Sequence, residues 1–309
     1  MISVIVCTHN PREAYLRRVV TALSDQTLPR DDWELLLIDN ASPQRLALPL
    51  DWHPHARIVR EERLGLTPAR LRGISESQGD VLVFVDDDNV LAKDYLAEVI
   101  RIRESWPILG AWGGRIDPEF ERLPPEWTQA YWHLLALASV DEPRWSNSRG
   151  INHAIPPGAG QCVLRSVALR YSELVRNDPL RHSLDRVGDS FSSCGDIDLA
   201  LTSLDLGLGT GQFPTLRLTH IIPPSRLEFD YLLKLVEGVA YSAHVFGYLH
   251  GQKPHDLRIS HSRAWFEAWQ RMRLPARQRA FARALERARQ RALADLAAIE
   301  RQRLLSASK

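Results

Sequence analysis

One stretch decides the fold: Val81-Leu82-Val83-Phe84-Val85-Asp86-Asp87-Asp88-Asn89, in which five apolar residues run directly into three carboxylates and an amide. A short, continuous apolar run is typical of a strand buried on both faces of a parallel sheet. Open α/β sheets bind their ligands at the carboxyl ends of such strands. Adjacent carboxylates repel one another unless a cation lies between them, and their oxygens suit Mg²⁺ or Mn²⁺. The stretch therefore predicts a metal and phosphate site, the alternative being an acidic turn that caps the following helix.

Strand and helix patterns alternate through the first 120 residues. Apolar runs predict strands over residues 2–7, 35–38, 57–60 and 81–85, and the segments between them predict helices over residues 11–23, 68–77 and 92–104. Such alternation predicts an α/β fold with a mainly parallel, doubly wound sheet flanked by helices.

The second half of the chain is less regular. Residues 118–157 are rich in Pro and Trp, which favours loops with one helix near residues 129–138. Further patterns predict a strand over residues 161–164, a helix from Ser166, a polar and mobile loop over residues 181–193, and helices over residues 197–206 and 229–249.

The tail from Arg263 onward is rich in Ala, Arg, Leu and Glu. Apolar residues recur there at helical spacing, at Phe281, Leu285, Ala288, Ala292, Leu296 and Ile299. We expect this stripe to pack on the body of the same chain. The alternatives are a helix that forms a homodimer and a basic helix that contacts an anionic membrane surface.

Composition excludes several classes of protein. The net charge of +1 over 309 residues gives no reason to expect a nucleic acid partner. The three cysteines, Cys7, Cys162 and Cys194, show no metal-binding spacing, which indicates buried free thiols in a reducing compartment. No apolar run approaches the roughly 20 residues that span a bilayer. We therefore expect a cytoplasmic protein, with peripheral contact at the inner face of the membrane left open.

Polar groups follow the other predicted strands as well. The first strand runs into Thr8-His9-Asn10-Pro11 and the second into Asp39-Asn40-Ala41-Ser42. Gly65 precedes a predicted helix that contains Arg70. Taken singly, these residues are explained by helix caps, an Asx turn and a surface ion pair. Together they converge on the edge of the sheet at which a nucleotide would bind.

These motifs together resemble glycosyltransferase family 2, the nucleotide-sugar-dependent enzymes of the GT-A fold. The resemblance spans roughly residues 3–249, and it rests on the order and spacing of four motifs: Ser3-Val4-Ile5-Val6-Cys7-Thr8-His9-Asn10, Leu37-Ile38-Asp39-Asn40-Ala41-Ser42, Gly65-Leu66-Thr67-Pro68-Ala69-Arg70 and Val83-Phe84-Val85-Asp86-Asp87-Asp88. It implies a GT-A domain over residues 1–253, with a nucleotide-binding half over 1–117 and an acceptor half over 118–253. A helical C-terminal extension then covers residues 254–309.

The resemblance also implies roles for single residues. Asp88 and His220 match the ligands of an Mn²⁺ or Mg²⁺ ion, and Asp87 matches a residue that faces ribose. Gly158 and Gly160 match a glycine loop beside the donor sugar. The remaining nucleotide-binding or donor-binding candidates are Thr8, Asn10, Asp39, Arg70 and Asp86.

The resemblance identifies Asp196 as the catalytic base. It lies in Cys194-Gly195-Asp196-Ile197-Asp198-Leu199, which is similar to the family's Glu-Asp-x-Asp-Leu segment, although Gly195 stands where many members have Glu. Asp198 is the second candidate for the base. The structural alternative is that both carboxylates cap a helix and interact with its dipole.

The implied activity is inverting transfer of a sugar from a nucleoside diphosphate sugar, most often a UDP-sugar, to an acceptor hydroxyl. The acceptor classes left open are a saccharide, a lipid-linked saccharide, a protein and a small metabolite. Two alternatives remain at this point: a non-catalytic protein that binds nucleotide sugars, which the Gly195 departure favours, and a sugar-phosphate nucleotidyltransferase.

Overall fold

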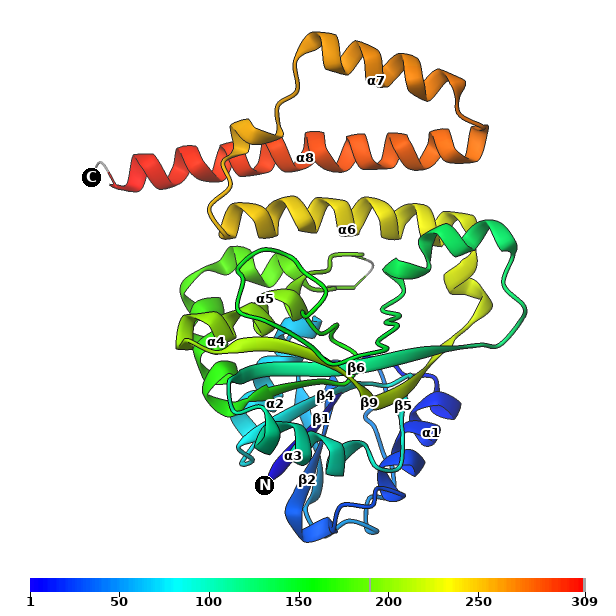
Figure 1. The fold of residues 1–309 in the computed structure, drawn as a ribbon, viewed down its shortest axis with the longest axis vertical. Helices are drawn as coiled ribbons and strands as arrows, with labels where there is room; N and C mark the ends of the chain where they lie inside the picture. The colour runs from blue at the N-terminus through cyan, green and yellow to red at the C-terminus, as the bar shows by residue number, and fades with distance from the viewer. Residues whose placement is uncertain (189, 308–309) are drawn as a thin grey trace. The chain divides into compact units, whose positions relative to one another are not determined.

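The computed structural model describes residues 1–188 and 190–307 (Figure 1). The chain falls into two compact units. The first contains Met1–Pro179 and Gly195–Pro224, and the second contains Leu180–Cys194 and Ser225–Lys309. Within the described ranges, no helix combines the length and the apolar character needed to cross a bilayer.

The first unit is built on one sheet, with the strand order β3-β2-β1-β4-β8-β6-β9-β5 and with β7 beside β9. Its strands are β1 (Ile2–Thr8), β2 (Trp33–Asn40), β3 (Ala56–Glu61), β4 (Val81–Asp86), β5 (Asn89–Leu91), β6 (Leu109–Phe120), β7 (Arg144–Ser146), β8 (Gln161–Leu164) and β9 (Gly209–Ile222).

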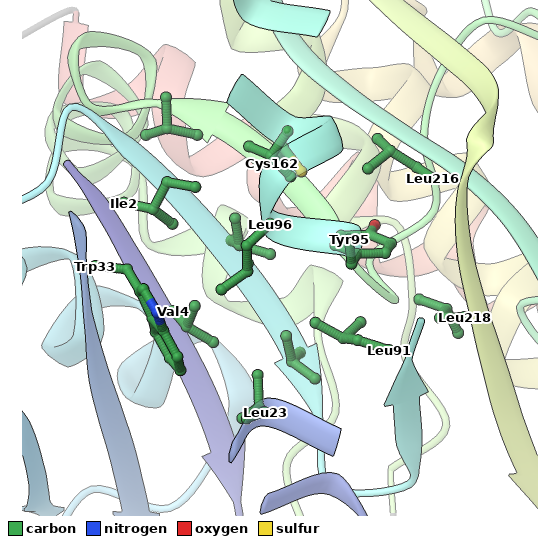
Figure 2. Close-up of a cluster of buried hydrophobic side chains, with 14 of the residues drawn as sticks. Ile2, Val4, Leu23, Trp33, Leu91, Tyr95, Leu96, Cys162, Leu216 and Leu218 are labelled. Carbon is green, nitrogen blue, oxygen red and sulfur yellow. The ribbon is translucent and has the colours of Figure 1, made fainter. Parts of the chain in front are cut away.

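The helices of this unit cover both faces of the sheet. They are α1 (Glu13–Ser24), α2 (Leu66–Glu76), α3 (Tyr95–Ser105), α4 (Arg165–Asn177) and α5 (Gly195–Leu201). Side chains of α1 and α3, such as Leu23 and Leu96, pack with Ile2 and Val4 of β1 in the main hydrophobic core (Figure 2). The opposite face of β1 carries Ile5, and α2 packs so closely on it that a Cβ atom at Gly73 would lie 2.4 Å from the Ile5 side chain.

The sheet joins a parallel half to a mixed half. Strands β1, β2, β3 and β4 pair in parallel, as expected for strands connected through helices. Strand β8 then pairs antiparallel to β4, and β6 pairs antiparallel to β8 and parallel to β9. The predicted α/β class is confirmed, and the buried strands of the parallel half lie where the apolar runs predicted them.

Several predicted elements differ from the structure. Strand β6 extends to Phe120, into a stretch that the Pro and Trp content assigned to loops. The helix predicted near residues 129–138 is instead a 3₁₀ segment, Glu126–Leu134. The helix predicted over residues 197–206 is α5 followed by a 3₁₀ turn, Thr202–Leu206, which ends at Gly207 with a φ of 72°. A tighter 3₁₀ turn is a common end of a helix.

The second unit consists mainly of three helices: α6 (Phe229–Leu249), α7 (His261–Arg273) and α8 (Ala276–Ala307). The apolar stripe of α8 is buried at Phe281, Ala288, Ala292 and Leu296. Leu285 was expected in this stripe but is 50% exposed, because Ala284 occupies the buried position of that turn.

Helix α8 packs along α6. The Phe281 ring lies 5.5 Å from that of Phe229, the Arg287 guanidinium pairs with Glu237, and the Tyr241 hydroxyl donates to Asp295 at 2.9 Å. Packing of the tail on its own chain is therefore confirmed. Residues 181–193 begin inside a 3₁₀ turn, Pro179–Leu184, and their mobility stays a prediction.

Candidate active site

The register of the parallel strands brings the first polar groups together. Thr8 at the end of β1 pairs with Asp39 of β2, while Cys7 pairs with Asp86 at the end of β4. The Thr8 hydroxyl, which is buried, donates a hydrogen bond to the Asp87 carboxylate. Three strand ends therefore contribute polar side chains to one edge of the sheet, as the sequence predicts.

Asp39 is held in a buried network of donors. Its carboxylate accepts from the Ser42 amide at 3.3 Å, from the Leu46 amide at 3.3 Å and from the Arg60 guanidinium at 2.8 Å. Burial opposes ionisation of Asp39, but the hydrogen bonds from Ser42, Arg60 and Leu46 outweigh it and hold the pKa of the carboxyl below its usual value. Asp39 is thus a fixed, negatively charged acceptor at neutral pH.

The loops after β1 and β2 are strained and tied to each other. Asn10 and Ala41 have φ angles of 47° and 51°, in the left-handed region that non-glycine residues seldom occupy. The Asn10 amide donates to the Ser42 hydroxyl at 2.9 Å, whereas the Asn10 side chain is exposed. Strained residues of this kind persist where the surrounding structure fixes them, and they gather at ligand sites.

Asn40 connects these loops to the start of α2. Its side-chain oxygen accepts from the Gly65 amide at 2.8 Å, and its side-chain nitrogen donates to the Arg63 carbonyl at 2.7 Å. Gly65 has a φ of 134°, so this position requires glycine. Asn40 thereby positions the helix that carries Arg70.

His220 lies beside Asp88 because β5 pairs with β9. Asn89, the first residue of β5, pairs with His220 of β9, and the Ile221 amide donates to the Asp88 carbonyl at 3.0 Å. The His220 Nε2 atom lies 3.5 Å from the Asp88 Oδ2 atom, and both side chains are buried. The side-chain nitrogen of Asn89, Nδ2, donates to the other Asp88 oxygen, Oδ1, at 3.1 Å.

The Asp88 and His220 pair fits a divalent cation. An octahedral ion with ligands at about 2.1 Å separates neighbouring donors by roughly 3 Å, close to the observed spacing. Carboxylate oxygen and neutral imidazole nitrogen are donors that suit Mn²⁺. Among the described residues, no group of three or more His, Cys, Asp or Glu side chains is placed to hold a metal ion by itself.

A second cluster joins Gly158, Arg70 and Asp196. The Gly158 amide donates to the Asp196 Oδ2 atom at 2.7 Å. A Cβ atom added to Gly158 would lie 2.9 Å from the Arg70 Nη2 atom and 3.1 Å from the same carboxylate oxygen. Arg70 is buried, so the surface ion pair considered for it is wrong. Glycine at position 158 lets the three groups meet without displacing the Arg70 guanidinium or the Asp196 side chain.

Strand β8 places this cluster next to the acidic triplet. Gln161, the first residue of β8, pairs antiparallel with Phe84, two residues before Asp86. The loop that contains Gly158 therefore arrives at the carboxyl end of β4. The Gln161 side chain also donates to the Asp196 carbonyl at 3.1 Å, which fixes the start of α5 against the sheet.

The two candidate bases differ in accessibility. Asp196 is partly exposed, whereas Asp198 is 1% exposed. Asp196 also accepts from the amide of the next residue, Ile197, at 2.9 Å in the first turn of α5, so its carboxylate is oriented by the helix start and stays partly exposed. Cys194, just before this helix, has a φ of 86°, a further strained residue next to the site.

Gly160 faces away from these clusters. A Cβ atom added there would lie 2.4 Å from the Tyr95 hydroxyl and 2.5 Å from Leu218, both in the hydrophobic core. The Tyr95 hydroxyl donates to the Gly160 carbonyl at 2.6 Å. Glycine at this position is explained by core packing and by a φ of 70°, and the predicted contact with a donor sugar stays a prediction.

The sequence did not single out several residues that position the site. They are Asn40, Asn89, Arg60 and Gln161, which hold the loops and carboxylates described above. Asn40 and Asn89 each follow a predicted strand-end carboxylate, and that placement is the one signal the sequence offered. The role of Arg60 and Gln161 depends on strand pairing, which no local pattern reveals.

The family model of Glycosyl transferase family 2 matches residues 3–168, more than half of the chain. This chain belongs to glycosyltransferase family 2. The match covers the four strand-end motifs, Gly158 and Gly160, and it ends before Asp196 and His220. Family 2 membership disfavours the nucleotidyltransferase alternative.

Relatives of this family 2 chain are glycosyltransferases by name. An uncharacterized glycosyltransferase from Haemophilus influenzae is 28% identical over 108 residues, which are 35% of this chain and 36% of that protein. Polypeptide N-acetylgalactosaminyltransferase 3 from Drosophila melanogaster is 32% identical over 117 residues, which are 33% of this chain and 17% of that protein. The chain thus spans about a third or less of these relatives.

One solved structure shows the shared fold. GalNAc-T7 with UDP, GalNAc and Mn²⁺ has a TM-score of 0.51 to this chain at 20% identity, over 80% of this chain and 51% of that one. At this identity the likeness is one of fold alone, and the predicted GT-A fold is confirmed.

Proposed function

We propose that this family 2 chain transfers a sugar from a UDP-sugar to an acceptor hydroxyl and inverts the anomeric centre. The single observation that carries the proposal is the shared edge of the sheet, at which Asp39, the acidic triplet and the loop that bears Gly158 converge. The three features match the three parts of a nucleoside diphosphate sugar. Asp39 offers a hydrogen-bond acceptor to the base, the acidic triplet offers carboxylates near ribose and diphosphate, and the glycine loop offers accessible backbone to the sugar.

The nucleoside end would bind at β1 and β2. Asp39 is held ionised by its donors and presents a fixed acceptor that suits the N–H of a uracil ring. Thr8 and Asp87 are already joined by a hydrogen bond, so Asp87 is oriented before ribose arrives. The Asn10 amide and the Ser42 hydroxyl fix the shape of the loops around this end.

The diphosphate end would bind near Asp88 and His220. When bound there, Mn²⁺ or Mg²⁺ would offset the negative charge of the diphosphate that leaves. Asn89 holds one oxygen of Asp88, which leaves the other, Oδ2, facing His220 Nε2. The buried Arg70 beside Gly158 adds a fixed positive charge to this region.

Asp196 would act as the base. Its Oδ2 atom accepts from the Gly158 amide, so the carboxylate is oriented beside the glycine loop and retains lone pairs for the acceptor hydroxyl. We infer that it takes the proton as that hydroxyl attacks the anomeric carbon. One attack from the face opposite the leaving group inverts the centre, so an α-linked donor gives a β-linked product. The buried Asp198 is less accessible to an acceptor.

Transfer assays with a panel of UDP-sugars and saccharide acceptors test the proposal. The proposal expects UDP release that depends on both Mn²⁺ and acceptor, with a β-linked product by NMR. Retention of the α-configuration would contradict the inverting mechanism. Binding of UDP with no transfer and no hydrolysis of any donor would favour the non-catalytic alternative that Gly195 raises.

A further inference from the structure

Helix α7 turns its large apolar side chains toward solvent. Trp265 and Met272 are 68% and 66% exposed, and Phe266 is 48% exposed. Trp265 and Met272 are seven residues apart and therefore lie on the same face of the helix. A helix that contributes to a core buries such residues, so the outward face of α7 requires another explanation.

Two charged side chains of α7, Glu267 and Arg271, are half-buried, whereas Arg263 and Arg273 are exposed. Glu267 and Arg271 are 31% and 25% exposed and pair with each other. They line a groove of about 870 Å³ together with Leu285 and Arg289 of α8. Figure 1 shows α7 running along α8 within this unit. The inward side of α7 thus leaves an open groove in which Trp269 and charged side chains both take part, while Trp265 and Met272 lie outside it.

The segment around α7 is strongly basic. Residues 258–291 contain ten arginines and two glutamates, with no lysine and no aspartate, a formal excess of eight positive charges. The whole chain has a net charge of +1, so all other residues together carry a formal charge of minus seven. Positive charge is therefore concentrated in the segment that also exposes the tryptophan and methionine.

We propose that α7 is a membrane-docking helix that binds an anionic lipid surface. Trp265, Phe266 and Met272 enter the boundary between headgroups and acyl chains, and exposed arginines of the segment, such as Arg263 and Arg273, contact lipid phosphates. An exposed apolar face with basic residues around it is the arrangement of helices that lie in the plane of a membrane interface. With 13 residues α7 is too short to span the bilayer, which takes about 20. The proposal is independent of the proposed glycosyl transfer.

Two other partners fit these residues less well. A second copy of this chain would bring two strongly positive segments together, which opposes dimerisation through α7. RNA binding would use tryptophan rings to stack bases. The Arg273 guanidinium already lies over the Trp269 ring, 3.5 Å from its centroid, which covers one face of that ring. Met272 also has no stacking role.

Co-sedimentation of the full chain with vesicles tests the proposal. Vesicles of phosphatidylcholine alone are compared with vesicles that contain phosphatidylglycerol. The test variant is Trp265→Ser with Met272→Ser, two exposed positions at which folding should be unaffected. Trp145→Ser, 48% exposed in the other unit, is the matched control. Thermal melting shows whether each variant is folded.

The proposal expects binding to the anionic vesicles, loss of that binding by about tenfold in the double variant, and little change in the control. High salt should weaken binding as well, since part of the attraction is electrostatic. Absence of binding to anionic vesicles, or equal binding by the double variant and the wild type, would overturn it. A dimer in light scattering that the double variant abolishes, without vesicle binding, would assign the face to a second copy. RNA binding that depends on Trp265, again without vesicle binding, would overturn the proposal too.

Discussion

The His220 Nε2 atom lies 3.5 Å from the Asp88 Oδ2 atom, inside the fold. The two residues are distant in sequence and meet because β5, a strand of three residues, pairs with the end of β9. The turn between β4 and β5 thus places the last carboxylate of the triplet against an imidazole. We expect this pair to hold the cation that accompanies the donor diphosphate.

Replacing Asp88 by alanine should abolish metal-dependent transfer. Loss of one fixed contact to developing charge lowers kcat by roughly 10²–10³-fold. UDP release is measured as a function of Mn²⁺ concentration. Asp80→Ala is the control, since Asp80 precedes the same strand and pairs with the N-terminal amine at the surface. Wild-type turnover by the Asp88 variant would remove the proposed role.

Replacing Asp196 by asparagine should preserve donor binding and lower kcat. A positioned base contributes about 10²–10⁴-fold in rate. Asparagine has one oxygen in place of two, so it can keep the hydrogen bond from the Gly158 amide but loses the one from the Ile197 amide. Thermal melting of the variant checks that it is folded. Donor binding by calorimetry and kcat by UDP release separate the two effects. If this variant is fully active while Asp198→Asn is folded and inactive, the base is Asp198.

Gly160 and Gly207 allow the cost of an added Cβ atom to be compared at two positions with similar backbone conformation. Both have a φ near 70°, but a Cβ atom would meet the Tyr95 hydroxyl at Gly160 and nothing within 4 Å at Gly207. Alanine at Gly207 should cost about 1 kcal/mol for the left-handed backbone alone. Alanine at Gly160 should cost several times as much, because the core must shift. Chemical denaturation measures both, and equal losses would show that the Tyr95 contact is unimportant.

The Asp39 and Arg60 pair predicts a pH dependence of stability. Because the pKa of Asp39 is lowered in the folded chain, its ionisation stabilises the fold above the unfolded value of 3.8 and this contribution is lost as pH falls through the folded value. Arg60→Gln should therefore be less stable than the wild type near pH 7. The difference should shrink as pH falls below about 4. A difference that is constant from pH 7 to pH 3 would contradict this.

Substitution of Phe281 tests how strongly the second unit depends on the packing of α8 against α6. The Phe281 ring is 4% exposed and packs against Phe229 of α6. Phe281→Ala should destabilise the second unit by about 3–5 kcal/mol, the usual cost of emptying a buried aromatic site. Phe266→Ala, on the exposed face of α7, should cost less than about 0.5 kcal/mol. Equal melting temperatures for the two variants would show that α8 does not depend on α6.

The parallel half of the sheet could be predicted from sequence because β1, β2 and β4 carry apolar runs. The mixed half could not, since β6 contains Gly110, Gly113, Gly114 and Pro118, which usually mark loops. Gly114 is required by tertiary contact: a Cβ atom there would lie 2.1 Å from the Leu216 carbonyl of β9. Strand pairing creates this need, and no local pattern reveals it.

The same distinction holds for the candidate site, in which some residues follow from local sequence and others depend on strand pairing. Asp39 and the acidic triplet follow directly from the apolar runs that precede them. The placement of His220 beside Asp88 depends on β5 and β9. That of Asp196 beside Arg70 depends on the loop in which glycine at position 158 approaches both side chains closely. The family resemblance identified these residues from the sequence, but the contacts between them can be seen only in the folded structure.

Thermal melting with nucleotides tests the central claim most directly. The wild type and Asp88→Ala are melted with UDP, GDP, dTDP and CDP, each with and without Mn²⁺. A ligand at 100 times its Kd adds about 2.7 kcal/mol of stability, a readily measured shift. The account predicts a shift with UDP and Mn²⁺ together that Asp88→Ala loses. No shift with any nucleotide, or the same shift in both proteins, would contradict it.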